Sequence, residues 1–174
     1  MNIRRATIAD CDAILALIRD LAEYERELDA VEATVETLAA TLFGDQPTAY
    51  CDLVEVDGEV VGMAIWFLNF STWQSKYGIY LEDLFVRPAH RGQGFGHSLL
   101  KHLAQTCVEN GYGRFQWSVL DWNQPAIDFY TQLGAVAMDE WTVYRVSDDA
   151  LNNLATSNAP VRASGNDERR RSTF

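Results

Sequence analysis

The hydrophobic and polar positions of the chain alternate between strand-like and helix-like periods, which predicts an α/β fold. Helical stripes, in which apolar residues recur three or four positions apart, are seen after Thr7, over 31–43, after Gly96 and after Asn123. Short apolar or alternating runs, typical of strands, occur at 3–6, 50–56, 60–68, 79–86, 114–120 and 141–146. The order predicts a mixed sheet flanked by helices, with a tight hairpin at Asp57-Gly58.

A basic, glycine-rich turn stands between the strand at 79–86 and the helix that follows it. The turn reads R-G-Q-G-F-G, from Arg91 to Gly96, and its three glycines leave room for a ligand close to the backbone. The next helix carries its apolar stripe from Leu99 to Val108 and ends at Asn110-Gly111. Free amides at its first turn, together with the helix dipole, predict a site for a pyrophosphate group.

Other glycine-rich motifs fit less well. A dinucleotide fingerprint requires G-x-G-x-x-G and an acidic residue about twenty positions later, whereas Gly92, Gly94 and Gly96 have G-x-G-x-G spacing. No G-K-[S/T] is present, which excludes a P-loop. A turn that binds nothing is the remaining simple alternative. The pattern R-x-x-G-x-G resembles the acetyl-CoA motif of the GCN5-related N-acetyltransferase (GNAT) superfamily.

A second motif strengthens this resemblance. The string WNQPAIDFYTQLGA, from Trp122 to Ala135, is similar to the family's N-x-x-A-x-x-F-Y-x-x-x-G-[A/F] signature. The resemblance implies a GNAT fold, in which the mixed sheet is mostly antiparallel, is flanked by helices and has a central V-shaped splay between the strands at 79–86 and 114–120. It also implies that acetyl-CoA is the cosubstrate, that Tyr130 lies near the departing sulfur, and that the enzyme is a homodimer. The residues expected to bind the cofactor are Leu84, Phe85, Val86, Arg91, Gly92, Gln93, Gly94, Phe95, Gly96, His97, Asn123, Pro125, Ala126 and Tyr130.

Three further strings resemble the diamine branch of the family, which includes the spermidine/spermine and thialysine acetyltransferases. These are L-A-E-Y-E-R-E at 21–27, Y-L-E-D-L-F-V at 80–86 and D-W-N-Q-P-A-I-D-F-Y at 121–130. The short Asp57-Gly58 turn departs from the longer insertion of the eukaryotic polyamine enzymes. By the resemblance, the amine-binding residues are Tyr24, Glu25, Trp73, Glu82, Gln116, Trp117, Asp121 and Glu140.

The composition suits one catalytic domain, expected over 1–154, followed by a polar tail over 155–174 that we expect to be disordered. The 174 residues carry a net charge of −11, and residues 1–154, with ten Lys and Arg against 23 Asp and Glu, carry about −13. This charge favours small cationic partners and disfavours nucleic acid. No apolar run is long enough to span a membrane, and no secretory signal begins the sequence. Three cysteines without metal-type spacing indicate reduced thiols in the cytoplasm and no metal site.

The chemistry of acetyl transfer selects the catalytic candidates. An alkyl amine has a pKa of about 10.4 and must lose a proton before it can attack, and a carboxylate near the acetyl group could take that proton directly or through water. Glu82 interrupts an apolar strand and is the predicted base, whereas strand alternation places Asp83 on the opposite face. A backbone amide within 84–86 would polarise the carbonyl, and Tyr130 would protonate the leaving thiolate. A non-catalytic acyl-CoA sensor and a dinucleotide-dependent oxidoreductase stay as alternatives.

Overall fold

The computed structural model describes residues 1–157, and its compact part divides into two units. The first unit comprises Met1–Ala126, and the second begins at Ile127. Residues 158–174, most of the predicted tail, lie outside the described residues. The predicted domain over 1–154 stays a prediction.

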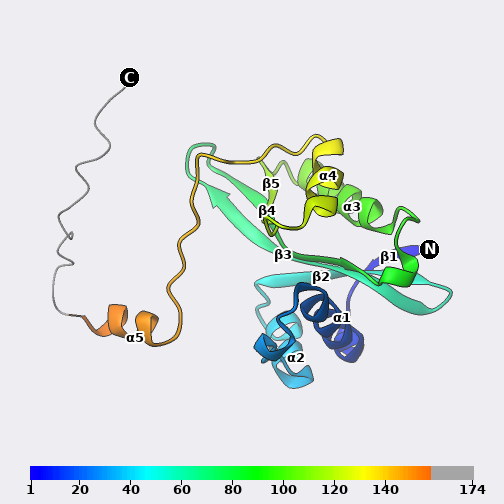
Figure 1. Ribbon diagram of the computed structural model, residues 1–174, viewed down its shortest axis with the longest axis horizontal. Helices are drawn as coiled ribbons and strands as arrows, with labels where there is room; N and C mark the ends of the chain where they lie inside the picture. Colours follow the sequence, from blue (N-terminus) through cyan, green and yellow to red (C-terminus); the bar gives the residue numbers. More distant parts are fainter. Residues whose placement is uncertain (158–174) are drawn as a thin grey trace. The chain divides into compact units, whose positions relative to one another are not determined.

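Five strands form the sheet of the first unit, in the order β1-β2-β3-β4-β5 (Figure 1). All neighbours are antiparallel except β4 and β5, which are parallel, so the mixed, mostly antiparallel sheet is confirmed. Asp57 and Gly58, at φ of 51° and 84°, make the two-residue turn of the predicted hairpin. The strands are β1 (Asn2–Arg5), β2 (Ala49–Val56), β3 (Glu59–Ser71), β4 (Lys76–Val86) and β5 (Phe115–Trp117).

Helices cover both faces of this sheet. The α1 helix (Cys11–Glu25) and the α2 helix (Val35–Phe43) lie on one face, and the α3 helix (Phe95–Glu109) lies on the other (Figure 1). Short 3-10 turns η1 (Ile8–Asp10), η2 (Leu28–Ala30) and η3 (Pro88–His90) connect the elements. A capping box at Thr7 and Asp10 opens the first helical segment, and Thr34 caps α2 by accepting a hydrogen bond from the Thr37 amide at 3.2 Å.

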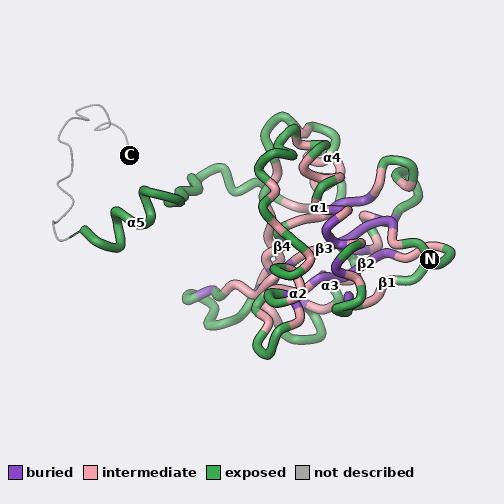
Figure 2. Tube along the Cα trace, turned by 90° about the horizontal axis from the view of Figure 1, so that it is seen from below, coloured by how far each residue is buried: buried purple, intermediate pink, exposed green. Residues whose placement is uncertain are grey.

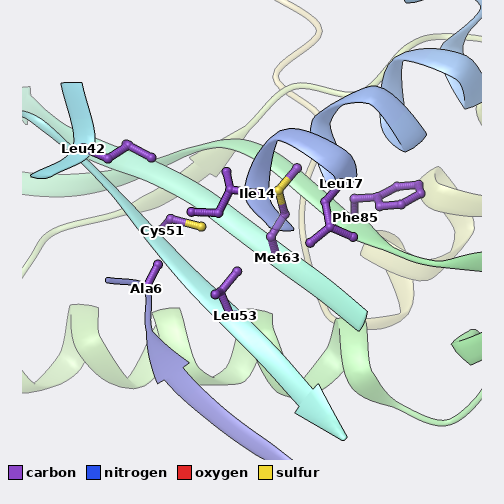
Figure 3. Packing of buried hydrophobic residues seen from close by; sticks show 8 residues of the cluster. All are labelled: Ala6, Ile14, Leu17, Leu42, Cys51, Leu53, Met63 and Phe85. Carbon is purple, nitrogen blue, oxygen red and sulfur yellow. The ribbon is translucent and has the colours of Figure 1, made fainter. Parts of the chain in front are cut away.

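The hydrophobic core lies between α1, α2 and the sheet. Ile14 and Leu17 of α1 are fully buried and point toward Leu53 and Met63 on the strands (Figure 3). Buried positions follow the strands and the inner sides of the helices in the first unit (Figure 2). Phe85 of β4 belongs to this cluster, and Leu21, near the end of α1, packs against it. Among residues 1–157, every helix is too short or too polar to cross a lipid bilayer.

Two strand predictions differ from the structure. The predicted strand at 114–120 is confined to Phe115–Trp117, and the predicted strand at 141–146 does not form among the described residues. Val143 and Tyr144 are 82% and 91% exposed, and in the part of the chain that the structure describes no strand pairs with this segment in a hydrogen-bond ladder. The second unit instead contains part of the α4 helix (Gln124–Gln132), which spans the boundary, and the α5 helix (Asp148–Thr156), which the sequence analysis did not predict.

Candidate active site

The predicted splay between β4 and β5 is present, and it opens one edge of β4. The two strands pair only from Ile79 to Leu81, so within residues 1–157 no strand pairs with the rest of β4 on that side. Successive residues of a strand direct their amides to opposite edges, and the Arg87 amide bonds to Val61 on the β3 side. The amides of Leu84 and Val86 therefore face the open edge, where a pantetheine chain or a carbonyl oxygen can accept hydrogen bonds.

The glycine turn after β4 forms a cradle at the start of α3. Gly92 and Gly94 have φ of 76° and 81°, a region that favours glycine, and Gly94 is the N-cap of α3. At Gly96 a Cβ atom would have open space around it. The first backbone bond of α3 runs from Ser98 to Gly94, so the amides of the three preceding residues are not used by the helix. This cradle has the geometry and dipole that suit a pyrophosphate.

The Arg91 side chain clamps the turn against the strand. Its Nε donates to the Val86 carbonyl at 2.9 Å, and its guanidinium lies 4.8 Å from the centroid of the Tyr24 ring and 5.5 Å from that of Phe85. These contacts hold β4, the turn and the end of α1 in a fixed arrangement. Arg91 thus holds the glycine turn in place relative to β4 and α1.

Tyr24 also reaches the second sequence motif. Its hydroxyl donates to Asn123 Oδ1 at 3.3 Å, and its ring lies 6.0 Å from that of Trp122. The same Asn123 oxygen accepts a hydrogen bond from the Ala126 amide at 3.4 Å, close to the start of α4. The structure therefore brings together α1, the glycine turn and the second motif, which are far apart in the sequence, around one aromatic ring.

A β-bulge in β4 corrects the prediction about Glu82 and Asp83. Ile65 pairs with Asp83 and Trp66 pairs with Leu81, so Glu82 is an extra residue that has no partner on β3. Because the bulge resets the alternation, Asp83 shares the face of its partner Ile65, which packs against the core under α1 and α2. The expectation that Asp83 points to the opposite face is wrong.

Asp83 lies in an acidic environment at the end of α1. Burial, and then the nearby charges of Glu82 and Glu25, raise the pKa of Asp83 from 3.8 to about 6. Burial also raises the pKa of Glu25, while Glu82 is exposed. Among residues 1–157, Asp83 takes part in no ion pair. A partly buried carboxylate with a pKa near neutrality is suited both to attract a cation and to accept a proton.

The other predicted amine-binding residues are dispersed. Gln116 lies on the Asp83 face, where its Oε1 accepts from Asn69 Nδ2 at 2.9 Å, but Trp117 shares the opposite face with Leu81 and Trp66. Trp73 is 93% exposed in the turn between β3 and β4. Asp121 and Glu140 are exposed, and Glu140 belongs to the second unit.

The second unit contains the predicted acid, Tyr130, on α4. Burial raises the pKa of this phenol above its ordinary value. Its hydroxyl carries a proton at neutral pH, as any tyrosine does, and can donate it. Pro125 occupies the first turn of the same helix, where a missing amide hydrogen has little cost.

The arrangement of an open strand edge, a glycine cradle and a second motif agrees with comparisons to known proteins. Residues 14–135 match the acetyltransferase (GNAT) family. The chain therefore belongs to this family, whose members use acetyl-CoA as cosubstrate, and the predicted acetyltransferase is confirmed.

Particular relatives are similar over most of the chain. The sequence is 40% identical to bovine (Bos taurus) thialysine N-epsilon-acetyltransferase over 164 residues, which cover 88% of this chain and 96% of that protein. It is 35% identical to human (Homo sapiens) spermidine/spermine N(1)-acetyltransferase-like protein 1, covering 88% of this chain and 24% of that longer protein. Among solved structures, an integron cassette protein from the mobile metagenome of V. cholerae superimposes with a TM-score of 0.77 at 27% identity, covering 90% and 98% of the two chains.

Proposed function

We propose that this enzyme transfers the acetyl group of acetyl-CoA to a small cationic amine, either a polyamine or a lysine- or thialysine-like amino acid. The observation that carries this proposal is the acidic pole formed by Glu25, Glu82 and Asp83 beside the open edge of β4. The net charge of −11 favours the approach of a cation. The names of the relatives support acceptors of this class.

In the proposed reaction the Glu82–Asp83 pair accepts a proton from the ammonium group of the acceptor. The neutral nitrogen forms a C–N bond to the acetyl carbon while the C–S bond breaks. The Leu84 or Val86 amide stabilises the negative charge that develops on the carbonyl oxygen. Tyr130 then gives its proton to the departing thiolate. The family signature around Tyr130 supports this last role.

The cofactor-binding residues are proposed on the basis of the cradle. Amides of 95–97 would bind the pyrophosphate, and the open edge at 84–86 would bind the pantetheine. Gly96, where even a Cβ atom would meet open space, fits the close approach of a phosphate. Asn123, held by Tyr24 and by the Ala126 amide, would position the start of α4 beside this cradle.

We also propose a homodimer in the cytoplasm. Trp73 is at the far end of the β3–β4 hairpin, on the order of 25 Å along β4 from Asp83 in one chain. An acceptor held at Asp83 can therefore meet Trp73 only if a second copy supplies it. The exposed neighbours Phe70 and Tyr77, whose rings lie 5.5 Å apart, give this hairpin end an aromatic surface. The free, buried thiols of Cys11, Cys51 and Cys107 agree with a reducing compartment.

The function is tested with the purified full chain, acetyl-CoA and a panel of polyamines, basic amino acids and the neutral amine aniline. Release of CoA and the mass of the product are measured together. We expect acetylation of the cationic acceptors, and a Tyr130→Phe variant with lower turnover but unchanged affinity for acetyl-CoA. Preference for aniline over every cationic acceptor would contradict the proposal. Light scattering of the wild type and of Trp73→Ser tests the dimer.

A further inference from the structure

A row of polar side chains continues from Asp83 along the same face of the sheet. Tyr80 pairs with Phe67, which lies two residues from Ile65, the partner of Asp83. Tyr80 therefore faces the same side as Asp83. On β5, Gln116 pairs with Tyr80 and continues the row.

The groups in this row differ in charge from the acidic pole at Asp83. The Tyr80 hydroxyl and Ser118 Oγ lie 2.7 Å apart, and both are neutral hydrogen-bonding groups. Farther along the row, the Arg114 side chain packs directly against Gly78. A Cβ atom added at Gly78 would lie only 2.6 Å from Arg114 Cγ. The face that is negative at Asp83 thus becomes neutral and then positive.

Arg114 is connected to the neutral groups through hydrogen bonds. Its Nε donates to Asn69 Oδ1 at 3.3 Å, and one terminal nitrogen donates to the Phe70 carbonyl at 3.1 Å. Asn69 in turn donates to Gln116 Oε1 at 2.9 Å. Among residues 1–157, no carboxylate forms an ion pair with Arg114. Its positive charge is therefore available to an anionic group bound nearby.

The spacing of the row matches an amino acid with an amine on its side chain. Tyr80 is three residues from Asp83, or about 7–10 Å along the bulged strand. An extended lysine spans about 7 Å from its side-chain amine to its carboxyl carbon. With the amine at Asp83, the carboxylate would lie beside the hydroxyls of Tyr80 and Ser118, on the side that faces Arg114.

We infer that Tyr80, Ser118, Gln116 and Arg114 form a distal subsite that selects zwitterionic acceptors over diamines of the same length. This inference rests on the proposed function and narrows its substrate class. A carboxylate gains from hydroxyl donors and from a guanidinium. A second ammonium at the same place meets a positive charge and no carboxylate. Arg114 is in this scheme a specificity residue that acts at the far end of the acceptor.

The test compares lysine with cadaverine and ornithine with putrescine, which differ only by the carboxylate. We measure kcat/KM at saturating acetyl-CoA for the wild type, Arg114→Gln, Arg114→Lys and the exposed control Arg19→Gln. We expect the wild type to prefer lysine over cadaverine by about tenfold or more, the size of a charge-assisted contact. Arg114→Gln should lower this ratio by reducing activity toward lysine alone, because the charge of Arg114 acts on the carboxylate from the neighbouring positions of the row. Arg114→Lys should keep an intermediate ratio, and Arg19→Gln should keep the full ratio.

Equal or better use of cadaverine by the wild type would overturn the inference, as would an equal loss for both acceptors in Arg114→Gln. If that variant does not fold, judged by circular dichroism, the double variant Tyr80→Phe, Ser118→Ala replaces it, with the same expected change in the ratio. Failure to acetylate any amine would instead contradict the proposed function itself.

Discussion

Each face of the sheet carries an aspartate that is at least partly buried, and the charged groups around the two aspartates differ in sign. On the α3 face, Asp52 is 1% exposed, accepts from Trp66 Nε1 at 2.7 Å and lies 3.4 Å from Arg5 and 3.7 Å from His102. On the α1 face, Asp83 has Glu82 and Glu25 as its charged neighbours. A buried carboxylate surrounded by hydrogen-bond donors and cations stabilises the fold. A carboxylate surrounded by other carboxylates instead lowers the free energy of unfolding. Asp83 is therefore the aspartate that is available for chemistry.

The largest effect should follow from Asp83→Asn. This change removes the more buried carboxylate of the Glu82–Asp83 pair that we assign to proton transfer, so kcat/KM should fall by about 10²-fold or more. The free energy of unfolding should stay the same or increase, because a repulsive charge is lost. Steady-state kinetics and denaturant melts measure the two quantities. Glu82→Gln is the matched control, and a smaller loss is expected because its side chain is exposed. A larger loss in Glu82→Gln would reverse the roles of the two acids.

The next largest effect concerns the cradle. Gly94→Val places a β-branched residue at φ of 81°, so the start of α3 must shift. Affinity for acetyl-CoA should fall more than about tenfold, or 1.4 kcal/mol. Gly58→Val introduces the same backbone strain at φ of 84° in the β2–β3 turn and should leave this affinity unchanged. Calorimetry with CoA compares the two variants. Similar losses of affinity in both would show that the effect is general destabilisation.

Local elements of this site could be predicted from the sequence, because their signals are contained in neighbouring residues. The glycine turn, the start of α3 and the Asp57-Gly58 hairpin all follow from backbone preferences of a few positions. The bulge at Glu82 could not, because it depends on the register of β4 against β3. Strand alternation was the wrong rule there, and it assigned Asp83 to the wrong face.

Contacts between distant segments were also beyond the sequence analysis. Tyr24 was assigned to the amine site only through family resemblance, and nothing in the sequence indicated its contacts with Arg91 and Asn123. The predicted strand at 141–146 has a suitable alternating pattern, but a strand also needs a neighbour, and sequence alone does not supply one. Local sequence patterns therefore predict many of the elements, but not the strand or distant segment with which each element pairs.

A third prediction addresses the opposite face. Asp52→Asn removes a negative charge that Arg5 and Trp66 surround, so the free energy of unfolding should decrease by about 1–3 kcal/mol. The acetylation rate per folded molecule should change little, because Asp52 faces away from the site. Urea melts and active-site titration with CoA separate these effects. The comparison fails if Asp52→Asn lowers the rate as strongly as Asp83→Asn.

The dependence on pH gives a smaller effect. The pKa of Asp83 is raised to about 6 in the folded protein, so below this pH the group is protonated and cannot accept a proton. The value of kcat/KM should therefore fall as pH decreases through about 6. The linked stability has the opposite sign: the folded state binds this proton more tightly, so the destabilisation caused by Asp83 is relieved between about pH 6 and 4. Asp83→Asn should lack both changes. If kcat/KM of Asp83→Asn still falls as the pH decreases through about 6, a group other than Asp83 is responsible for the fall.

The smallest effect should come from Tyr24→Phe, which removes one hydroxyl and keeps the ring. The lost hydrogen bond to Asn123 is 3.3 Å long and partly exposed, so it should contribute only about 0.5–1 kcal/mol, or a two- to fivefold rise in the KM for acetyl-CoA. Tyr24→Leu removes the ring as well and releases the Arg91 guanidinium that lies over it. A larger rise in Tyr24→Leu than in Tyr24→Phe would therefore show that the ring, through Arg91, maintains the cradle. Equal KM values for both variants would mean that the Tyr24 hydroxyl alone connects α1 to the second motif. The contacts with Val86 and Phe85 would then be sufficient to position Arg91.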